Sequence, residues 1–216
     1  MEKFSLLLSS RKRSLNYLVM LVKNNLKPDF VILYSKEKNK KILKILNVNK
    51  IRYVYLRTNQ INASIVEREI IKTKNKIFIF SGYGAQIIKS KKILNKIILH
   101  AHPGSLYDFK GSTTMYYSLL LKKKITCSIL RLNKKIDSGV IYFRQKFILP
   151  KNIKIKKFEN DFDNNVRILT IIKYLKLCKG KKIKPLFKKK YKKTHKSTYY
   201  ICHPILRGLA FNKNFS

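Results

Sequence analysis

Residues 76–106, KIFIFSGYGAQIIKSKKILNKIILHAHPGSL, decide the fold that the sequence predicts. An apolar run over 76–88 passes into the glycine-containing loop SGYGA (81–85), and a second apolar run over 95–102 ends at a proline and a glycine. Strands that are apolar throughout are typical of a parallel sheet that is covered on both faces. Ligands of such sheets bind beyond the carboxyl ends of the strands. The sequence therefore predicts a binding site at the two loops that follow these runs.

Segments with strand-like and helix-like patterns alternate around this stretch. Strand-like apolar runs lie at 4–10, 28–35, 51–57, 126–133 and 139–149, and helical patterns lie at 13–26, 38–49, 62–73, 112–123 and 160–178. Asn62 stands at an N-cap position of its helix, and Asp161 and Asp163 lie near the positive N-terminal end of the last one. The alternation predicts an α/β fold that is Rossmann-like, with a mostly parallel sheet and helices on both faces.

The C-terminal third differs in composition from the rest of the chain. We expect one main domain over residues 1–150 and then a C-terminal helix and basic tail over 151–216. Residues 179–196 contain ten lysines in eighteen residues, and such a run is expected to be solvated and mobile. Residues 199–211 are predicted to form a short amphipathic segment that packs on the core.

The charge of the chain is strongly positive. Its 216 residues include 50 Lys and Arg but only 10 Asp and Glu, which gives a net charge of +40. A polyanionic partner would explain this charge, and so would a biased nucleotide composition of the genome, because Lys, Ile, Asn, Phe and Tyr are all abundant and Trp is absent. The lysines are spread over the whole chain, which favours the compositional explanation. We therefore expect no specific nucleic-acid partner.

The cysteines and the apolar runs indicate the compartment. Cys127, Cys178 and Cys202 form no CxxC pair, which is typical of free thiols in a reducing compartment and not of a disulfide framework or a zinc site. The apolar run near the N-terminus is too short for a signal peptide, and no run approaches the length of about 20 residues that a membrane span needs. We expect a cytoplasmic protein that binds no membrane.

Three polar residues stand at predicted strand ends. His100 and His102 are two residues apart, so their side chains leave the same face of an extended strand. Asp137 lies 35 residues after His102 in the predicted turn 134–138, and a helix and a strand between them can bring the chain back. An Asp in a turn before a glycine is also a common structural residue, so the pattern alone leaves both roles open.

The segments HAHPGSLYDFKGSTTMYYSLL (100–120) and ILRLNKKIDSGVIYFRQKF (129–147) together resemble the folate-dependent formyltransferase family. The family includes glycinamide ribonucleotide formyltransferase, the catalytic domain of methionyl-tRNA formyltransferase and sugar N-formyltransferases. The resemblance implies the Rossmann-like formyltransferase fold and makes residues 1–150 the catalytic domain. It also implies transfer of a formyl group from 10-formyltetrahydrofolate to the amine of a small acceptor, either an amino sugar nucleotide or glycinamide ribonucleotide.

The resemblance also assigns site residues. His102 and Asp137 take the places of the family's histidine and aspartate, and His100 takes the place of its asparagine. The residues that match the strand and loop lining the folate pocket are Phe80, Ser81, Gly82, Tyr83 and Gly84.

The chain departs from the family pattern at Gly104, where the family has serine, and at the second proline of the motif, which is Asp108 or missing. The His-Ala-His-Pro-Gly variant resembles a branch found in surface-polysaccharide contexts.

Formyl transfer to an amine passes through a tetrahedral oxyanion, so the site needs hydrogen-bond donors for that oxygen and a base for the amine proton. In the family, the asparagine and the histidine donate hydrogen bonds, and the aspartate manages the proton, partly by orienting the histidine. The resemblance gives the roles of the histidine and the aspartate to His102 and Asp137. His100 replaces an asparagine as donor only if it presents an N–H, because a neutral imidazole has one donor where an amide has two.

Three alternatives remain open from the sequence. A non-catalytic binding protein of the same fold would explain the altered motif. A tRNA formyltransferase would explain the charge, although only residues 151–216 follow the catalytic part. A metal-dependent hydrolase would use His100, His102 and Asp137 as ligands, but such enzymes usually need more ligands than this chain offers, and we expect no metal. A homodimer is compatible with each of these.

Overall fold

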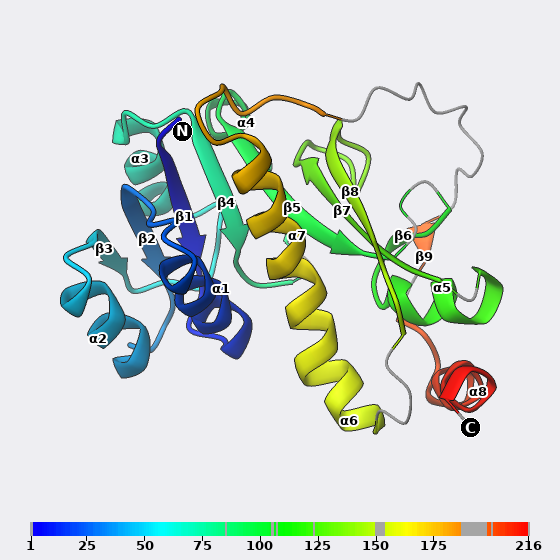
Figure 1. Cartoon of the computed structure of the whole chain (residues 1–216). Coiled ribbons are helices and arrows are strands. Elements are labelled where there is room, and N and C mark those ends of the chain that lie inside the picture. Colours follow the sequence, from blue (N-terminus) through cyan, green and yellow to red (C-terminus); the bar gives the residue numbers. More distant parts are fainter. Residues whose placement is uncertain are drawn as a thin grey trace. The chain divides into compact units, whose positions relative to one another are not determined.

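The structure is a computed structural model that describes residues 2–84, 86–104, 106, 108–122, 124–149, 154–186, 198–199 and 201–215 (Figure 1). Seven strands form one sheet in the order β3-β2-β1-β4-β5-β7-β8, and two short strands, β6 and β9, form a second. The strands are β1 (Phe4–Leu8), β2 (Phe30–Tyr34), β3 (Arg52–Leu56), β4 (Ile77–Ser81), β5 (Ile97–Pro103), β6 (Lys110–Gly111), β7 (Ile125–Arg131), β8 (Ile141–Phe147) and β9 (Thr198–Tyr199). The helices are α1 (Lys12–Lys23), α2 (Lys40–Val48), α3 (Ser64–Lys72), α4 (Lys91–Leu94), α5 (Thr114–Lys122), α6 (Ile155–Lys157), the π-helical η1 (Phe158–Phe162), α7 (Asp163–Leu177) and α8 (Pro204–Phe215).

The sheet is mostly parallel, as predicted. Strand β1 pairs in parallel with β2 and β4, β2 with β3, and β4 with β5, whereas β7 and β8 are antiparallel. The parallel strands alternate with helices along the chain, which is the connection that parallel neighbours require. The predicted α/β class with a mostly parallel sheet is therefore confirmed.

Two compact units make up the chain. The first comprises residues 1–100, 131–134 and 175–183, and the second comprises 101–130, 135–174 and 184–216. These units do not follow the division at residue 150 that the sequence suggests, and that division into domains stays a prediction.

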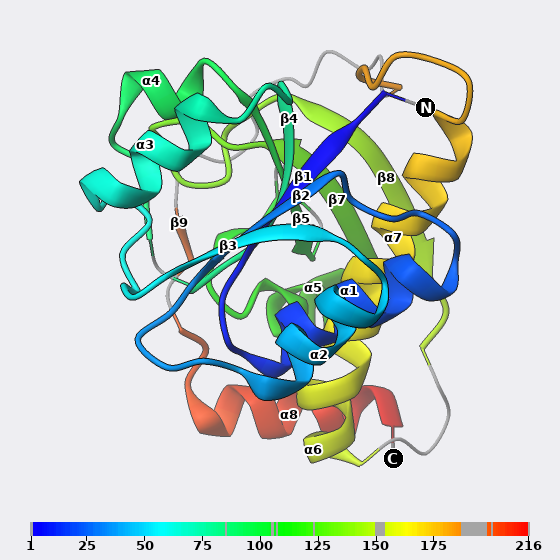
Figure 2. The same ribbon diagram turned by 90° about the vertical axis from the view of Figure 1, so that its left-hand side faces the viewer.

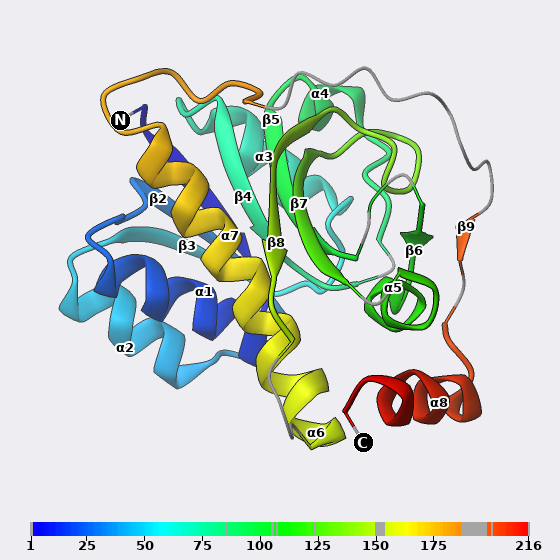
Figure 3. The same cartoon turned by 45° about the vertical axis from the view of Figure 1, so that its right-hand side comes forward.

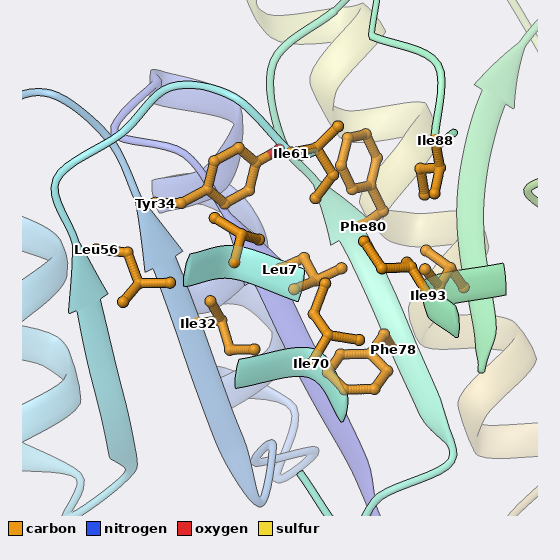
Figure 4. Packing of buried hydrophobic residues seen from close by; sticks show 12 residues of the cluster. Leu7, Ile32, Tyr34, Leu56, Ile61, Ile70, Phe78, Phe80, Ile88 and Ile93 are labelled. Atoms are coloured by element: carbon orange, nitrogen blue, oxygen red, sulfur yellow. The ribbon is translucent and has the colours of Figure 1, made fainter. Parts of the chain in front are cut away.

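In the first unit, helices α1 and α2 cover one face of the sheet and α3 and α4 cover the other (Figure 2). Alternate residues of a strand point to opposite faces, and β1 and β4 are buried at every position. Figure 4 shows the core on the α3 and α4 side, where Ile70 of α3 and Ile93 of α4 pack over Leu7, Ile32 and Phe78. This double coverage explains the continuous apolar runs of the sequence.

In the second unit, α8 lies beside α5 (Figure 3). Ala210 of α8 is fully buried. The Tyr116 hydroxyl donates to Glu159 Oε1 at 2.7 Å, and Arg207 of α8 binds the same oxygen at 3.3 Å. The predicted closing segment 199–211 therefore contains the last residue of β9 and most of α8, which packs on α5. Of the lysine-rich segment 179–196, residues 187–196 lie outside the described residues.

Two local predictions need correction. Helix α3 has Ala63 as its N-cap residue, and Asn62 instead holds the segment after β4: its Nδ2 donates to the Ile87 carbonyl at 2.8 Å and its Oδ1 accepts from Lys89 N at 2.9 Å. The predicted helix 160–178 is preceded by α6, and its first residues belong to η1. No helix in the described part of the chain is long and apolar enough to cross a membrane.

Candidate active site

The candidate site begins where β5 ends. Ala101, His102 and Pro103 are buried, and the chain then turns at Gly104, whose φ is +117°. The Gly104 N–H donates to the Thr126 carbonyl of β7 at 2.6 Å. A Cβ on Gly104 would lie 2.6 Å from Thr114 Oγ1, so only glycine fits between the strand end and the start of α5. Gly104 stands where the folate-dependent formyltransferase family has serine, and this turn has no room for a side chain.

His102 and Asp137 meet as the sequence predicts. His102 Nδ1 lies 3.3 Å from Asp137 Oδ2. Asp137 has a φ of +44° in the turn before β8, a conformation that Asp tolerates better than most residues. The Gly111 N–H donates to the same Asp137 oxygen at 2.8 Å and fixes the orientation of the carboxylate.

The other nitrogen of His102 also faces protein groups. Nε2 lies 3.2 Å from the Phe109 carbonyl oxygen and 3.1 Å from Thr114 Oγ1. The Thr114 hydroxyl gives its single proton to the Pro103 carbonyl, so in this arrangement it accepts from Nε2. Each ring nitrogen therefore faces an acceptor, and a full set of hydrogen bonds needs two protons on the His102–Asp137 pair.

Burial disfavours the second proton on the His102–Asp137 pair. The ring is 3 % exposed, and burial lowers the pKa of His102 below its ordinary value. The Asp137 carboxylate opposes this lowering, whereas the positive charge of Arg167 adds to it. When the pair keeps one proton, that proton belongs between Nδ1 and Asp137, because the charged carboxylate is a stronger acceptor than the Phe109 carbonyl. Nε2 is then a base, and the Thr114 hydroxyl can turn from Pro103 to donate to it.

An ion pair on α7 lies against the same strand end. Arg167 Nη1 donates to the Ala101 carbonyl at 2.7 Å, and Arg167 Nε binds Asp163 Oδ2 at 3.0 Å. Asp163 was expected only as a favourable charge at a helix N-terminus, and Arg167 was not expected in the site at all.

His100 has a different environment. It belongs to the first unit, is half-buried, and places the edge of its ring against Phe80, with 5.8 Å between the ring centroids. The structure thus brings His102 and Asp137 together, and it places His100 in aromatic contact with Phe80. Among the described residues, which include all three, no group of three or more His, Cys, Asp or Glu side chains is placed to hold a metal ion.

The loop after β4 carries the five residues predicted to bind folate. Phe80, Ser81 and Gly82 are buried, Tyr83 is half-buried and Gly84 is exposed. The Tyr83 hydroxyl is hydrogen-bonded to Ser35 Oγ at 3.0 Å. The first three residues are therefore part of the packed first unit, and the last two are the accessible ones.

The Gly82 carbonyl in this loop accepts from Arg13 Nη2 at 2.9 Å.

Sequence reasoning missed four groups that contact the pair or its strand: the Phe109 carbonyl, the Gly111 N–H, Thr114 and Arg167. The first two are backbone groups, which a residue pattern does not show. Thr114 and Arg167 lie on helices where their spacing is unremarkable, although Asp163 and Arg167 are an i, i+4 pair that predicts a side-chain contact.

Comparison with known proteins identifies the fold. No family model matches the sequence, and no curated protein matches it closely enough to count as a relative. Solved structures do match. A sugar N-formyltransferase from a Shewanella species is 16 % identical, with a TM-score of 0.60 over 92 % of this chain and 76 % of that one.

Two further structures match in the same way. A phosphoribosylglycinamide formyltransferase from Streptococcus pneumoniae is 15 % identical, with a TM-score of 0.60 over 83 % of this chain and 98 % of that one. A formyltetrahydrofolate deformylase from Pseudomonas putida is 16 % identical, with a TM-score of 0.56 over 80 % of this chain and 63 % of that one. The chain therefore has the Rossmann-like fold of these two formyltransferases and of the deformylase, which confirms the resemblance at the level of the fold.

Proposed function

We propose that this chain is an N-formyltransferase that moves a formyl group from 10-formyltetrahydrofolate to the amine of a small acceptor. The observation that carries the proposal is the buried His102–Asp137 pair at the carboxyl end of β5, in a fold shared with formyltransferases. Such a pair is the proton acceptor that amine acylation requires.

The folate, when bound, supplies an activated formyl group. The acceptor nitrogen forms a bond to the formyl carbon while the bond from that carbon to N10 of the folate breaks. The His102–Asp137 pair takes the proton that the amine loses and returns it to N10, so no proton is gained or lost over the cycle. The lowered pKa of His102 favours its one-proton state, in which Nε2 carries no proton and can accept from the Thr114 hydroxyl.

Asp137 is the member of the pair that we assign to contact with the amine. Its side chain is 11 % exposed, whereas that of His102 is 4 % exposed. The Gly111 N–H fixes the carboxylate, and His102 holds its other side, so the proton acceptor is preorganised. In this assignment Asp137 takes and returns the proton, and His102 supports the carboxylate through its Nδ1–H.

The finer parts of the function are proposals too. We assign the folate to the loop that holds Tyr83 and Gly84, together with Phe80, Ser81 and Gly82 behind it, and we assign His100 to donation toward the oxyanion. The acceptor is an amino sugar nucleotide, as in surface-polysaccharide synthesis, or glycinamide ribonucleotide. We further propose a cytoplasmic enzyme, compatible with a homodimer, that binds no specific nucleic acid and no membrane.

Calorimetry with 5-formyltetrahydrofolate, an unreactive analogue of the donor, tests the folate assignment. We expect saturable binding that Asp137→Asn retains. Formyl transfer to an amino sugar nucleotide or to glycinamide ribonucleotide should fall by about 10²–10⁴-fold in Asp137→Asn, the range for loss of a general base. Glu67→Gln on α3 makes the same change of carboxylate to amide outside the site and should leave both unchanged. Absence of binding at millimolar analogue would refute the proposal.

A non-catalytic binding protein of the same fold is the second candidate. The observation that favours it is that both nitrogens of His102 are occupied by protein groups and that the ring is 3 % exposed. That protein would bind the folate analogue with no transfer to any acceptor amine, and Asp137→Asn would then change stability only. Binding and single-turnover transfer, measured on the same sample, separate the two candidates.

A further inference from the structure

We propose that Arg167 is a positioning residue for His102, and that the Asp163–Arg167 pair of α7 sets the charge around the buried imidazole. As a statement about catalysis this rests on the proposed function. As a statement about the surroundings of His102 it rests on the hydrogen bonds of Arg167 and does not depend on formyl transfer.

The positioning part follows from the hydrogen bonds. Ala101 is fully buried and directly precedes His102, and its carbonyl accepts from Arg167 Nη1 at 2.7 Å. Asp163 holds the guanidinium from the other side through Nε at 3.0 Å. A planar guanidinium with two fixed bonds defines the position of the strand end more strictly than a flexible ammonium would. Arg167 therefore fixes the backbone from which the imidazole projects.

The charge part follows from the groups that face the ring from every neighbouring segment. Asp137 comes from the turn before β8, and Arg167 and Asp163 come from α7. The Cys127 thiol of β7 is uncharged, because burial raises its pKa to about 12. The Phe109 carbonyl and the Thr114 hydroxyl are dipoles.

Burial is the largest influence on the pKa of His102 and lowers it. Among the charged groups, Asp137 raises this pKa, Arg167 lowers it and Asp163 raises it. The two members of the α7 ion pair thus act on the imidazole in opposite directions. Breaking the pair from one side or the other should consequently move the titration of His102 in opposite directions.

Opposite shifts of the His102 pKa distinguish a direct effect of the two charges from a general loss of stability. Arg167→Met removes the positive charge and leaves the Asp163 carboxylate, so the pKa of His102 should rise. Asp163→Asn removes the negative charge with almost no change of shape and leaves the guanidinium, so the pKa should fall. An ion pair whose charges do not act on the imidazole would change stability in both variants without opposite shifts, and the positioning role is tested separately by Arg167→Lys.

The experiment is a titration of the four histidines by NMR of their side chains, with His102→Gln to assign the resonance. Arg207→Met is the matched control, because it breaks another Arg–carboxylate pair of the second unit, with Glu159, and should leave the His102 titration unmoved. Shifts of the same sign in the two α7 variants, or no shift in either, would overturn the proposal. If Arg167→Met does not fold, the Asp163→Asn variant alone tests the proposal. A higher or unchanged pKa of His102 in that variant would overturn the proposal.

Activity provides a second readout. In the wild-type enzyme, the fall of kcat at acidic pH should follow the titration of His102. The pH at which kcat falls should be higher in Arg167→Met and lower in Asp163→Asn. Arg167→Lys keeps the charge but not the two fixed bonds, so its rate should be lower while the pH at which kcat falls stays unchanged. A chain that transfers no formyl group would refute the proposed function but would leave the NMR test intact.

Discussion

Replacing Gly104 by alanine should destabilise the protein far more than the same change at two other glycines. Gly104 combines a φ of +117° with a neighbour that leaves no room: its added Cβ would lie 2.6 Å from Thr114 Oγ1 and 2.8 Å from Thr114 Cβ. Gly180 has a φ of +77° but nothing within 4 Å of its added Cβ. Gly84 also has open space and no positive φ. The three sites separate backbone strain from steric overlap.

The expected magnitudes follow from these geometries. A non-glycine residue in an unfavourable backbone conformation costs about 1–3 kcal/mol, and overfilling a packed site typically costs about 1–3 kcal/mol more. Gly104→Ala should therefore lower the free energy of unfolding by about 2–6 kcal/mol. Gly180→Ala should lower it by about 1–2 kcal/mol, from strain alone. Gly84→Ala should change it by no more than about 0.5 kcal/mol.

The assay is urea unfolding of the three variants and the wild type, with the slopes compared so that only midpoint changes count. The NMR titration of His102 adds a local readout, because Thr114 must move to admit the new methyl group and Thr114 is bonded to His102 Nε2. If Gly104→Ala and Gly180→Ala lose the same stability, the close packing of the strand end against Thr114 is wrong. An unchanged His102 titration in Gly104→Ala would contradict the link between that packing and the imidazole.

Three further predictions concern protonation, the C-terminal helix and charge. The free energy of unfolding should fall as the pH drops below 6.5, because the pKa of His102 is lower in the folded protein than in the unfolded chain, and His102→Gln should flatten this slope in urea titrations at several pH values. Tyr116→Phe removes the hydroxyl that donates to Glu159 and should cost about 1 kcal/mol in the same assay, and a larger loss would mean that the contact organises more of α8. Filter binding should show that tRNA affinity falls steeply with salt and does not exceed that for a duplex of similar length, whereas a preference for initiator tRNA at physiological salt would favour the tRNA enzyme.

The fold could be predicted from the sequence because its central strands, such as β1 and β4, are buried on both faces. A strand such as β4 has no polar alternation, and five consecutive apolar or small residues flanked by helical patterns leave few other folds. The predictions that were wrong concern local structure. Asn62 has the right type and place for a helix cap, but its amide binds the backbone at Ile87 and Lys89, and a cap pattern cannot show which backbone group lies closer in the folded chain.

The site was predictable only where a side chain carries the chemistry. His102 and Asp137 stood out because few carboxylates and histidines exist in this chain, and their distance along the sequence suited a strand, a helix and a return. Arg167 did not stand out among 50 basic residues, and an i, i+4 pair with Asp163 has the pattern of an ordinary surface salt bridge. Its role depends on the position of the Ala101 carbonyl, which only the folded chain provides.

The hydrogen bonds around His102 also determine which group can respond when its proton moves. Asp137 as a carboxylate and the Phe109 carbonyl can only accept, and Arg167 can only donate. Of the groups named around this ring, the Thr114 hydroxyl can do either, by turning between the Pro103 carbonyl and His102 Nε2. When the Thr114 hydroxyl donates to the Pro103 carbonyl, as in this structure, the hydrogen bonds favour two protons on the His102–Asp137 pair. When the hydroxyl turns to donate to His102 Nε2, they favour one proton. Each proton that enters or leaves the imidazole is therefore coupled to a rotation at the first residue of α5, and Gly104 keeps that residue close enough for the coupling to hold.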